Sequence, residues 1–167
     1  ILPAGVAGPT TVWSYGASNQ LGTLNYPAFT IEAKRNTPTT ITWINGLVDE
    51  SGNYLPHLLP VDPTLHWANP PGGVPGRDMR PTFTATPGAY TGPVPIVTHV
   101  HGMESVPDWA DGYAEAWYLP AAANIPVDYA KVGTWYDFFK GKSGGNWAPG
   151  SATFVYPNSQ RPSTAWY

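Results

Sequence analysis

Two of the four histidines in this 167-residue chain, His99 and His101, are separated by a single residue. They lie in the apolar, β-branched run 95–102 (PIVTHVHG), which is typical of a buried strand. Side chains alternate between the faces of a strand, so both imidazoles would leave one face, about 6.6 Å apart at the backbone. They could then bind one metal ion together or one ion each, and imidazole suits copper, zinc, iron and nickel. A hydrogen-bonded pair of core histidines remains the alternative.

The other two histidines offer a weaker case for metal binding. His57 and His66 lie near the start of a proline-rich stretch, 60–93, which has too many prolines for a regular ladder. We interpret this stretch as a long surface connection, with one short strand around 79–84. Since neither histidine has a partner on the same face, we expect both to be packed or solvated side chains rather than ligands.

The composition indicates a folded β-rich domain and excludes several classes of protein. Pro (20) and Gly (18) are frequent, aromatic residues make up 14% of the chain and charged residues only 11%. Such a chain is too aromatic to be disordered, and its short β-branched runs between turns are typical of an all-β sandwich. The net charge of −3 comes without a basic cluster, which argues against nucleic acid as a partner. No apolar run is long enough for a membrane span.

Several short segments besides 95–102 have the alternation or the composition of strands. Residues 28–34 place Phe29, Ile31 and Ala33 on one face, and residues 39–44 form a second run that Asn45-Gly46 closes. The predicted strands, in addition to these, are 10–15, 133–139, 152–156 and 163–167.

The histidine motif is part of a longer ordered pattern. Thr98-His99-Val100-His101-Gly102 is followed by Trp109-Ala110-Asp111-Gly112, and together they resemble the first copper-binding motif of the multicopper oxidases. Flanking segments agree with the branch that includes spore-coat laccase, bilirubin oxidase and phenoxazinone synthase. These segments are 26–35 (YPAFTIEAKR), 41–47 (ITWINGL), 58–62 (LLPVD), 111–117 (DGYAEAW) and 156–161 (YPNSQR).

The resemblance implies a fold and a domain organisation. Multicopper oxidases of this kind consist of three cupredoxin domains, so the whole chain, 1–167, would be a single, truncated N-terminal cupredoxin domain. Its fold would be a cupredoxin-like Greek-key β-sandwich with long loops. The family's second His-x-His motif follows a Trp-Tyr pair, and this chain stops at Trp166-Tyr167. We therefore expect the next ligands to lie beyond the chain.

The resemblance also implies roles for three residues. His99 would bind the type 2 copper of a trinuclear cluster and His101 one of its type 3 coppers. Asp111 matches an acidic residue near that cluster, which would contact the coppers through water and assist proton transfer to reduced oxygen. An ordinary Asp-Gly turn would explain Asp111 equally well. Glu115 and Trp117 also match, but packing explains them adequately.

The remaining partners follow from what the chain lacks. A blue, type 1 copper needs a Cys thiolate, and this chain has no cysteine. The chain alone should thus be inactive, and the second and third cupredoxin domains should complete the oxidase, which couples oxidation of a small-molecule reductant to reduction of O2 to water. Because the chain starts at Ile1 rather than Met, we take it as mature, trimmed or a fragment. We expect a secreted or cell-surface location.

Two other functions remain possible on the sequence alone. A cupin also begins its metal motif with His-x-His, but Glu104 follows His101 too closely and a later histidine is missing. A non-catalytic carbohydrate-binding module could use the abundant Trp and Tyr, although it leaves the paired histidines unexplained. Within the oxidase reading, the reductant stays open among phenols, aminophenols, bilirubin-like pigments and Mn(II).

Overall fold

The structure, a computed structural model, describes residues 10–64, 69–80, 82–85 and 88–161. The chain divides into two compact units, 1–33 and 34–167. In the described part of the first unit, a single 3₁₀ turn, η1 (Leu21–Thr23), is followed by extended chain. The Thr23 hydroxyl accepts a hydrogen bond from the Ala17 amide at 2.7 Å and closes this turn.

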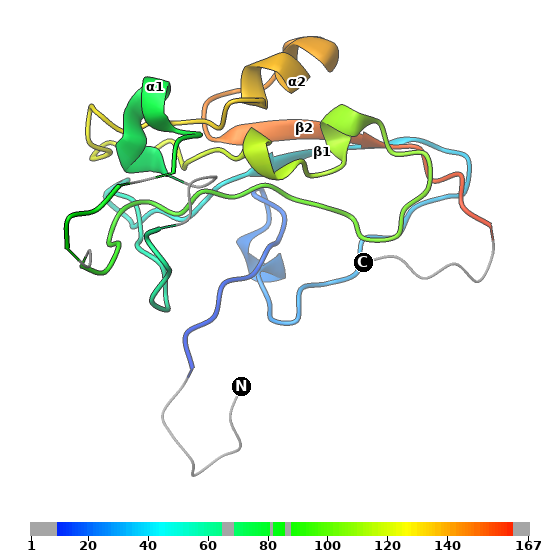
Figure 1. The fold of residues 1–167 in the computed structure, drawn as a ribbon. Helices are drawn as coiled ribbons and strands as arrows, with labels where there is room; N and C mark the ends of the chain where they lie inside the picture. The colour runs from blue at the N-terminus through cyan, green and yellow to red at the C-terminus, as the bar shows by residue number, and fades with distance from the viewer. Residues whose placement is uncertain (1–9, 65–68, 81, 86–87, 162–167) are drawn as a thin grey trace. The chain divides into compact units, whose positions relative to one another are not determined.

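The second unit contains a two-stranded antiparallel sheet. Strand β1 (Thr39–Ile44) pairs with β2 (Ser151–Tyr156), with Thr39 opposite Tyr156 and Ile44 opposite Ser151. The two strands run side by side in Figure 1 although most of the chain separates them. Both strands were predicted from their β-branched and aromatic alternation, and both predictions are confirmed.

The segment that carries His99 and His101 is extended chain rather than a regular strand, so that prediction is wrong in part. One isolated antiparallel bridge joins Ile96 to Tyr118, with two backbone hydrogen bonds of 3.1 and 2.9 Å. Tyr118 also forms a bridge to Val132. Prolines 93 and 95 lack the amide hydrogens that a longer ladder needs, which restricts the pairing to this short stretch.

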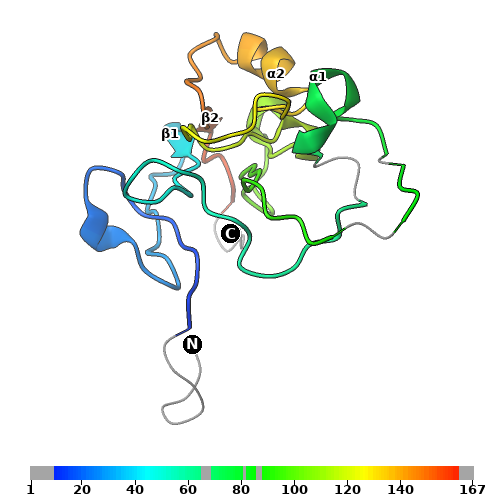
Figure 2. The same ribbon diagram turned by 90° about the vertical axis from the view of Figure 1, so that its left-hand side faces the viewer.

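The prediction of a strand at 133–139 is also wrong, because this region enters helix α2 (Tyr136–Lys142). Tyr136 and Phe139 are three residues apart and both are buried, so they form the inner face of one helical turn. Lys140 and Lys142 lie in the last turn, where positive charge is favourable. In both ribbon views α2 lies on one side of the sheet (Figures 1 and 2).

The other predicted strands have different outcomes. Residues 10–15 and 28–34 form no regular strand, and neither do the described residues of 79–84. The stretch 163–167 lies outside the described residues, as does His66. The other helical turns are η2 (Pro70–Gly72), α1 (Gly73–Gly76), η3 (Asp108–Ala110) and η4 (Ala114–Ala116).

An aromatic core joins the sheet to the segment that bears the histidines. Tyr118, Tyr136, Trp147, Phe154 and Tyr156 are buried together, and Ile96 and Val100 pack against them. The described residues therefore form extended segments with little helix, an architecture compatible with a β-sandwich. Within the residues that the structure describes, no helix is both long and apolar enough to cross a membrane.

Candidate metal centre

His99 and His101 lie next to each other on the surface. Their ring centroids are 5.8 Å apart and their planes are inclined by 48°. Both residues are exposed, and the side chain of His99 retains 47% of its accessible surface. The sequence predicted that the two imidazoles would leave the chain on one side, and the close ring contact agrees with that arrangement.

Asp111 holds His99 in one orientation. The Nδ1 atom of His99 lies 2.7 Å from the backbone carbonyl oxygen of Asp111 and 3.4 Å from its carboxylate oxygen Oδ1. A carbonyl oxygen can only accept a hydrogen bond, so Nδ1 carries the proton and donates it. In the neutral ring this hydrogen bond places the proton on Nδ1 and makes Nε2 the atom through which a metal would be bound.

Gly112 makes this contact possible. It has a positive φ of 71°, and a Cβ atom at this position would lie 2.4 Å from the carbonyl oxygen of Thr98 and 2.6 Å from the Cβ of His99. A glycine therefore lets the turn approach the histidine segment closely. The motif Asp-Gly is more than an ordinary turn in this fold, since its backbone packs directly on the first histidine.

The loop between the histidines and Asp111 is tied to α2. Asp108 forms an ion pair with Lys142 at the end of α2, and that amine lowers the pKa of the Asp108 carboxyl. Lys142 also lies 5.6 Å from the centre of the Phe138 ring. No pattern in the sequence pairs Asp108 with Lys142. The two residues are distant along the chain and come into contact only once α2 has folded as a helix.

Glu115 and Trp117, which also match the copper motif, have contacts that indicate packing rather than metal binding. Trp117 is buried in a small core cluster with Leu119 and Ala130, as the packing interpretation predicted. Burial raises the pKa of Glu115, and its hydrogen bond to the Asp78 carboxyl adds to that effect. Glu115 therefore joins the proline-rich connection to the core.

The other chemical groups do not extend the metal site. His57 packs edge-on against Tyr90, with ring centroids 5.7 Å apart, which supports its interpretation as a packed residue. Among the residues described, no group of three or more His, Cys, Asp and Glu side chains is arranged to hold a metal ion. The chain thus contributes two adjacent imidazoles, one with its tautomer fixed, and one carboxylate beside them.

Three exposed aromatic rings near α2 are not coplanar, as a flat sugar-binding surface would require. Tyr113, Trp135 and Phe138 are all exposed near the end of the Asp-Gly turn and along α2. The Trp135 ring is inclined by 62° to Tyr113 and by 87° to Phe138. Such edge-to-face packing buries ring edges against one another, whereas stacking on a sugar needs an open ring face.

Comparison with known proteins shows similarity along almost the whole chain. It is 31% identical over 160 residues to "Multicopper oxidase LPR1 homolog 1" of Oryza sativa subsp. japonica, an alignment that covers 95% of this chain. It is 28% identical over 159 residues to "Laccase" of Bacillus subtilis (strain 168), again over 95% of the chain. "Multicopper oxidase LPR2" of Arabidopsis thaliana is 30% identical over 158 residues.

The chain spans only about a fifth of these relatives, covering 19%, 21% and 19% of their respective lengths. No family model matches the sequence. No solved structure matches it either. The resemblance to multicopper oxidases is confirmed over 95% of the chain.

Proposed function

We propose that this chain, a homologue of multicopper oxidases, supplies the first pair of copper ligands to such an oxidase. The observation that carries the proposal is the contact between Nδ1 of His99 and the Asp111 carbonyl oxygen at 2.7 Å, which in the neutral ring leaves Nε2 available to bind a metal. Metal-binding histidines are commonly held in this way, with the second ring nitrogen bonded to a carbonyl or carboxylate.

The proposed fold is that of a cupredoxin-type Greek-key sandwich, forming the first of three such domains. The aromatic core beneath the histidines and the extended segments that bridge at Ile96, Tyr118 and Val132 support it. In this arrangement the sheet supports the histidine segment from below. The short loop 102–110 then returns the chain to Asp111.

His99 and His101 would bind different copper ions of one trinuclear cluster, His99 the type 2 ion and His101 a type 3 ion. The 5.8 Å separation of their ring centroids is compatible with one shared ion or with two neighbouring ions, and the family pattern favours two ions. Bound copper would pass electrons from the small-molecule reductant to O2, which four electrons and four protons reduce to water.

Asp111 would lie beside the coppers and act on them through water rather than as a ligand. Its carbonyl orients His99, and its carboxylate oxygen lies 3.4 Å from the same ring and remains 53% exposed. An exposed carboxylate in this position can accept and pass on protons through water as oxygen is reduced. Asp111 therefore has two separable roles, one in its backbone and one in its side chain.

A further polypeptide segment would cover His99 and His101 and contribute the remaining copper ligands. The exposure of both histidines and of Asp111 supports this arrangement, because a cluster that reduces oxygen is held away from bulk water. The reductant would be a phenol, an aminophenol or a related compound, oxidised one electron at a time at a type 1 copper outside this chain. A secreted or cell-surface location would suit such a substrate range.

The proposal is tested by His99→Ala in the full-length protein. We expect loss of the type 2 signal in electron paramagnetic resonance, one fewer copper ion by metal analysis and no oxygen uptake. Reduction of the type 1 copper by substrate should persist, because that site does not use His99. His57→Gln is the matched control, since His57 packs against Tyr90 away from the site, and it should retain copper and activity.

Two outcomes would contradict the proposal. One is full copper occupancy with normal oxygen uptake in His99→Ala. The other is oxygen reduction by the 167-residue chain on its own, because a chain without cysteine cannot hold the type 1 copper that receives electrons.

A further inference from the structure

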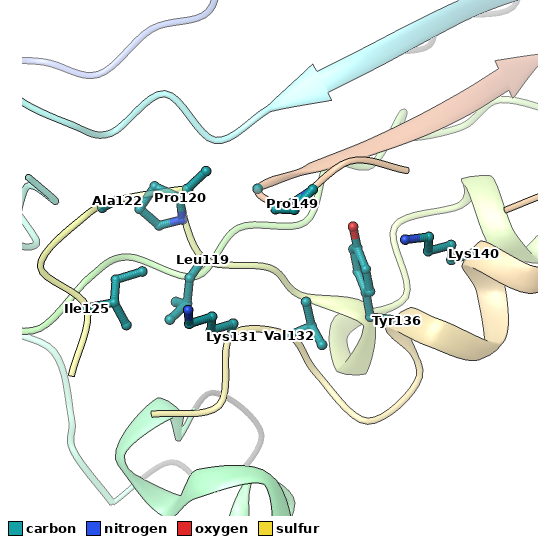
Figure 3. A pocket seen from close by; sticks show the side chains of 11 residues that line it. Leu119, Pro120, Ala122, Ile125, Lys131, Val132, Tyr136, Lys140 and Pro149 are labelled. Carbon is teal, nitrogen blue, oxygen red and sulfur yellow. The ribbon is translucent and has the colours of Figure 1, made fainter. Parts of the chain in front are cut away.

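A pocket of about 460 Å³ opens on the side of the second unit that carries α2. Its volume falls in the range of about 300–1,000 Å³ that is usual for sites that bind small molecules. Apolar side chains, notably Leu119, Ile125 and Val132, form much of its wall, and Pro120 and Pro149 lie opposite them (Figure 3).

Two lysines line this pocket and no acidic side chain does. The chain as a whole has more acidic than basic residues, 11 against 8, and only four of its residues are lysines. Half of the lysines therefore lie at one pocket. In Figure 3 Lys131 lies beside Leu119 and Val132, and the amine of Lys140 is directed toward Tyr136.

A hydrogen bond and a close backbone contact hold the part of the pocket formed by Tyr136 and Gly150. Tyr136 is buried, and its hydroxyl donates to the Ser151 carbonyl at 2.6 Å at the start of β2. Gly150 has a positive φ of 71° and lies so close to Ala121 that a Cβ there would be 2.7 Å from the Ala121 amide nitrogen. The walls are thus fixed by α2, by β2 and by the turn at Ala121 before any ligand enters.

We propose that this pocket binds a small organic anion with an apolar ring, such as an aromatic carboxylate. The ring would displace water from Ile125 and Val132, and the carboxylate would pair with the amine of Lys131 or of Lys140, which lie on either side of Val132 in Figure 3. A neutral ligand of the same shape would gain from the displaced water but not from pairing with a lysine. The inference is independent of copper, because the pocket shares no lining residue with His99, His101 or Asp111.

The test is calorimetric titration of the full-length protein with 2-naphthoate and with the neutral amide 2-naphthamide. We expect saturable binding of naphthoate, tighter than that of naphthamide and weakened by added salt. In the double variant K131M/K140M, which keeps most of the aliphatic stems, the dissociation constant for naphthoate should rise about tenfold while that for naphthamide stays the same.

Two further variants keep the result interpretable. Lys142→Met is the matched control, since its amine pairs with Asp108 outside the pocket, and it should bind naphthoate normally. Ala122→Phe should fill the pocket and weaken both ligands. The proposal is overturned if wild-type protein shows no saturable binding of naphthoate at millimolar concentrations. It is also overturned if the double variant binds naphthoate as well as the wild type does.

Discussion

At the scale of single residues, Asp111 contacts His99 through two different groups. Its backbone carbonyl accepts a hydrogen bond from Nδ1 at 2.7 Å, and its carboxylate oxygen lies 3.4 Å from the same nitrogen. Substitution of the side chain leaves the carbonyl in place. The orientation of the imidazole and the charge beside it can therefore be separated by experiment.

Asp111→Asn should retain copper and slow turnover. The variant keeps the carbonyl that fixes the tautomer of His99 but removes the negative charge and the proton-accepting oxygen. We expect normal copper content in the full-length protein and a loss of about 10- to 100-fold in kcat, the usual cost of losing a group that supports a metal ligand. Asp137→Asn, on the exposed side of α2, serves as the control. Loss of copper in Asp111→Asn would show instead that the carboxylate is needed to hold His99.

Gly112→Ala should disrupt the packing of the Asp-Gly turn against the histidine segment. The new Cβ would meet the Thr98 carbonyl at 2.4 Å, and the positive φ adds strain of about 1–2 kcal/mol. Gly52→Ala is a matched control, because Gly52 also has a positive φ of 77° but has open space around it. Urea unfolding should show the larger loss for Gly112→Ala, by about 1–3 kcal/mol more. Equal losses in the two variants would mean that the close approach has no energetic weight.

The candidate groups of the site came from the sequence more readily than their connections did. The two histidines were proposed from their spacing, and Asp111 was proposed from the resemblance to the copper motif. The backbone contact of Asp111 was missed, since the motif suggested that its carboxylate was the active part. Main-chain carbonyls have the same chemistry at every residue, so no side-chain pattern reveals which one a histidine will contact.

At the scale of elements, Asn45 connects the end of β1 to the segment that bears the histidines. Its side-chain amide is buried and donates to the carbonyls of Val94 at 2.8 Å and Tyr118 at 3.1 Å. One side chain thus joins three segments that are distant in sequence. This arrangement places the start of the run 95–102 relative to the sheet.

Asn45→Ala should destabilise the protein by about 1–3 kcal/mol, because the Val94 carbonyl would lose its donor and the Tyr118 carbonyl would keep only the Ile96 amide. Differential scanning calorimetry should show a lower Tm for this variant. The exposed Asn146 provides the comparison, since Asn146→Ala should change stability by no more than about 0.5 kcal/mol. A Tm for Asn45→Ala within that same small margin would exclude a structural role for this amide.

Strands β1 and β2 were predicted correctly, whereas helix α2 was not. β1 and β2 have clear alternation, and they pair with each other although they are distant in sequence. Residues 133–139 have the same aromatic content as a strand, but the spacing of Tyr136 and Phe139 suits a helical turn once a core lies beneath them. Propensity alone cannot choose between these, because both structures bury aromatic rings.

At the scale of the whole molecule, the buried tyrosines make stability depend on alkaline pH. Burial raises the pKa of Tyr136 to about 12 and that of Tyr156 to about 12, and it raises the pKa of Tyr118 further. In the unfolded chain tyrosine has a pKa of about 10. Between these values the unfolded chain releases protons that the folded chain retains, so the folded state becomes less stable as pH rises.

The free energy of unfolding should therefore be unaffected by these tyrosines below about pH 10 and should fall between about pH 10 and 12. Urea unfolding at a series of pH values would measure it, and tyrosinate absorbance would follow ionisation. Tyr156→Phe should show a shallower decline, because one titrating group is removed. Stability that increased above pH 10 would contradict the assignment of these tyrosines as buried and neutral.

The contact between His99 and Asp111 also has a consequence for the order in which the chain folds. It closes a loop between residues only 12 positions apart, whereas the pairing of Thr42 with Thr153 across the sheet joins residues 111 positions apart. Loops of about ten residues close in roughly 10–100 ns, far faster than pairings between distant strands. We therefore expect the ring nitrogen that is proposed to bind a metal to be selected by a local encounter, before the pairing of β1 with β2 forms.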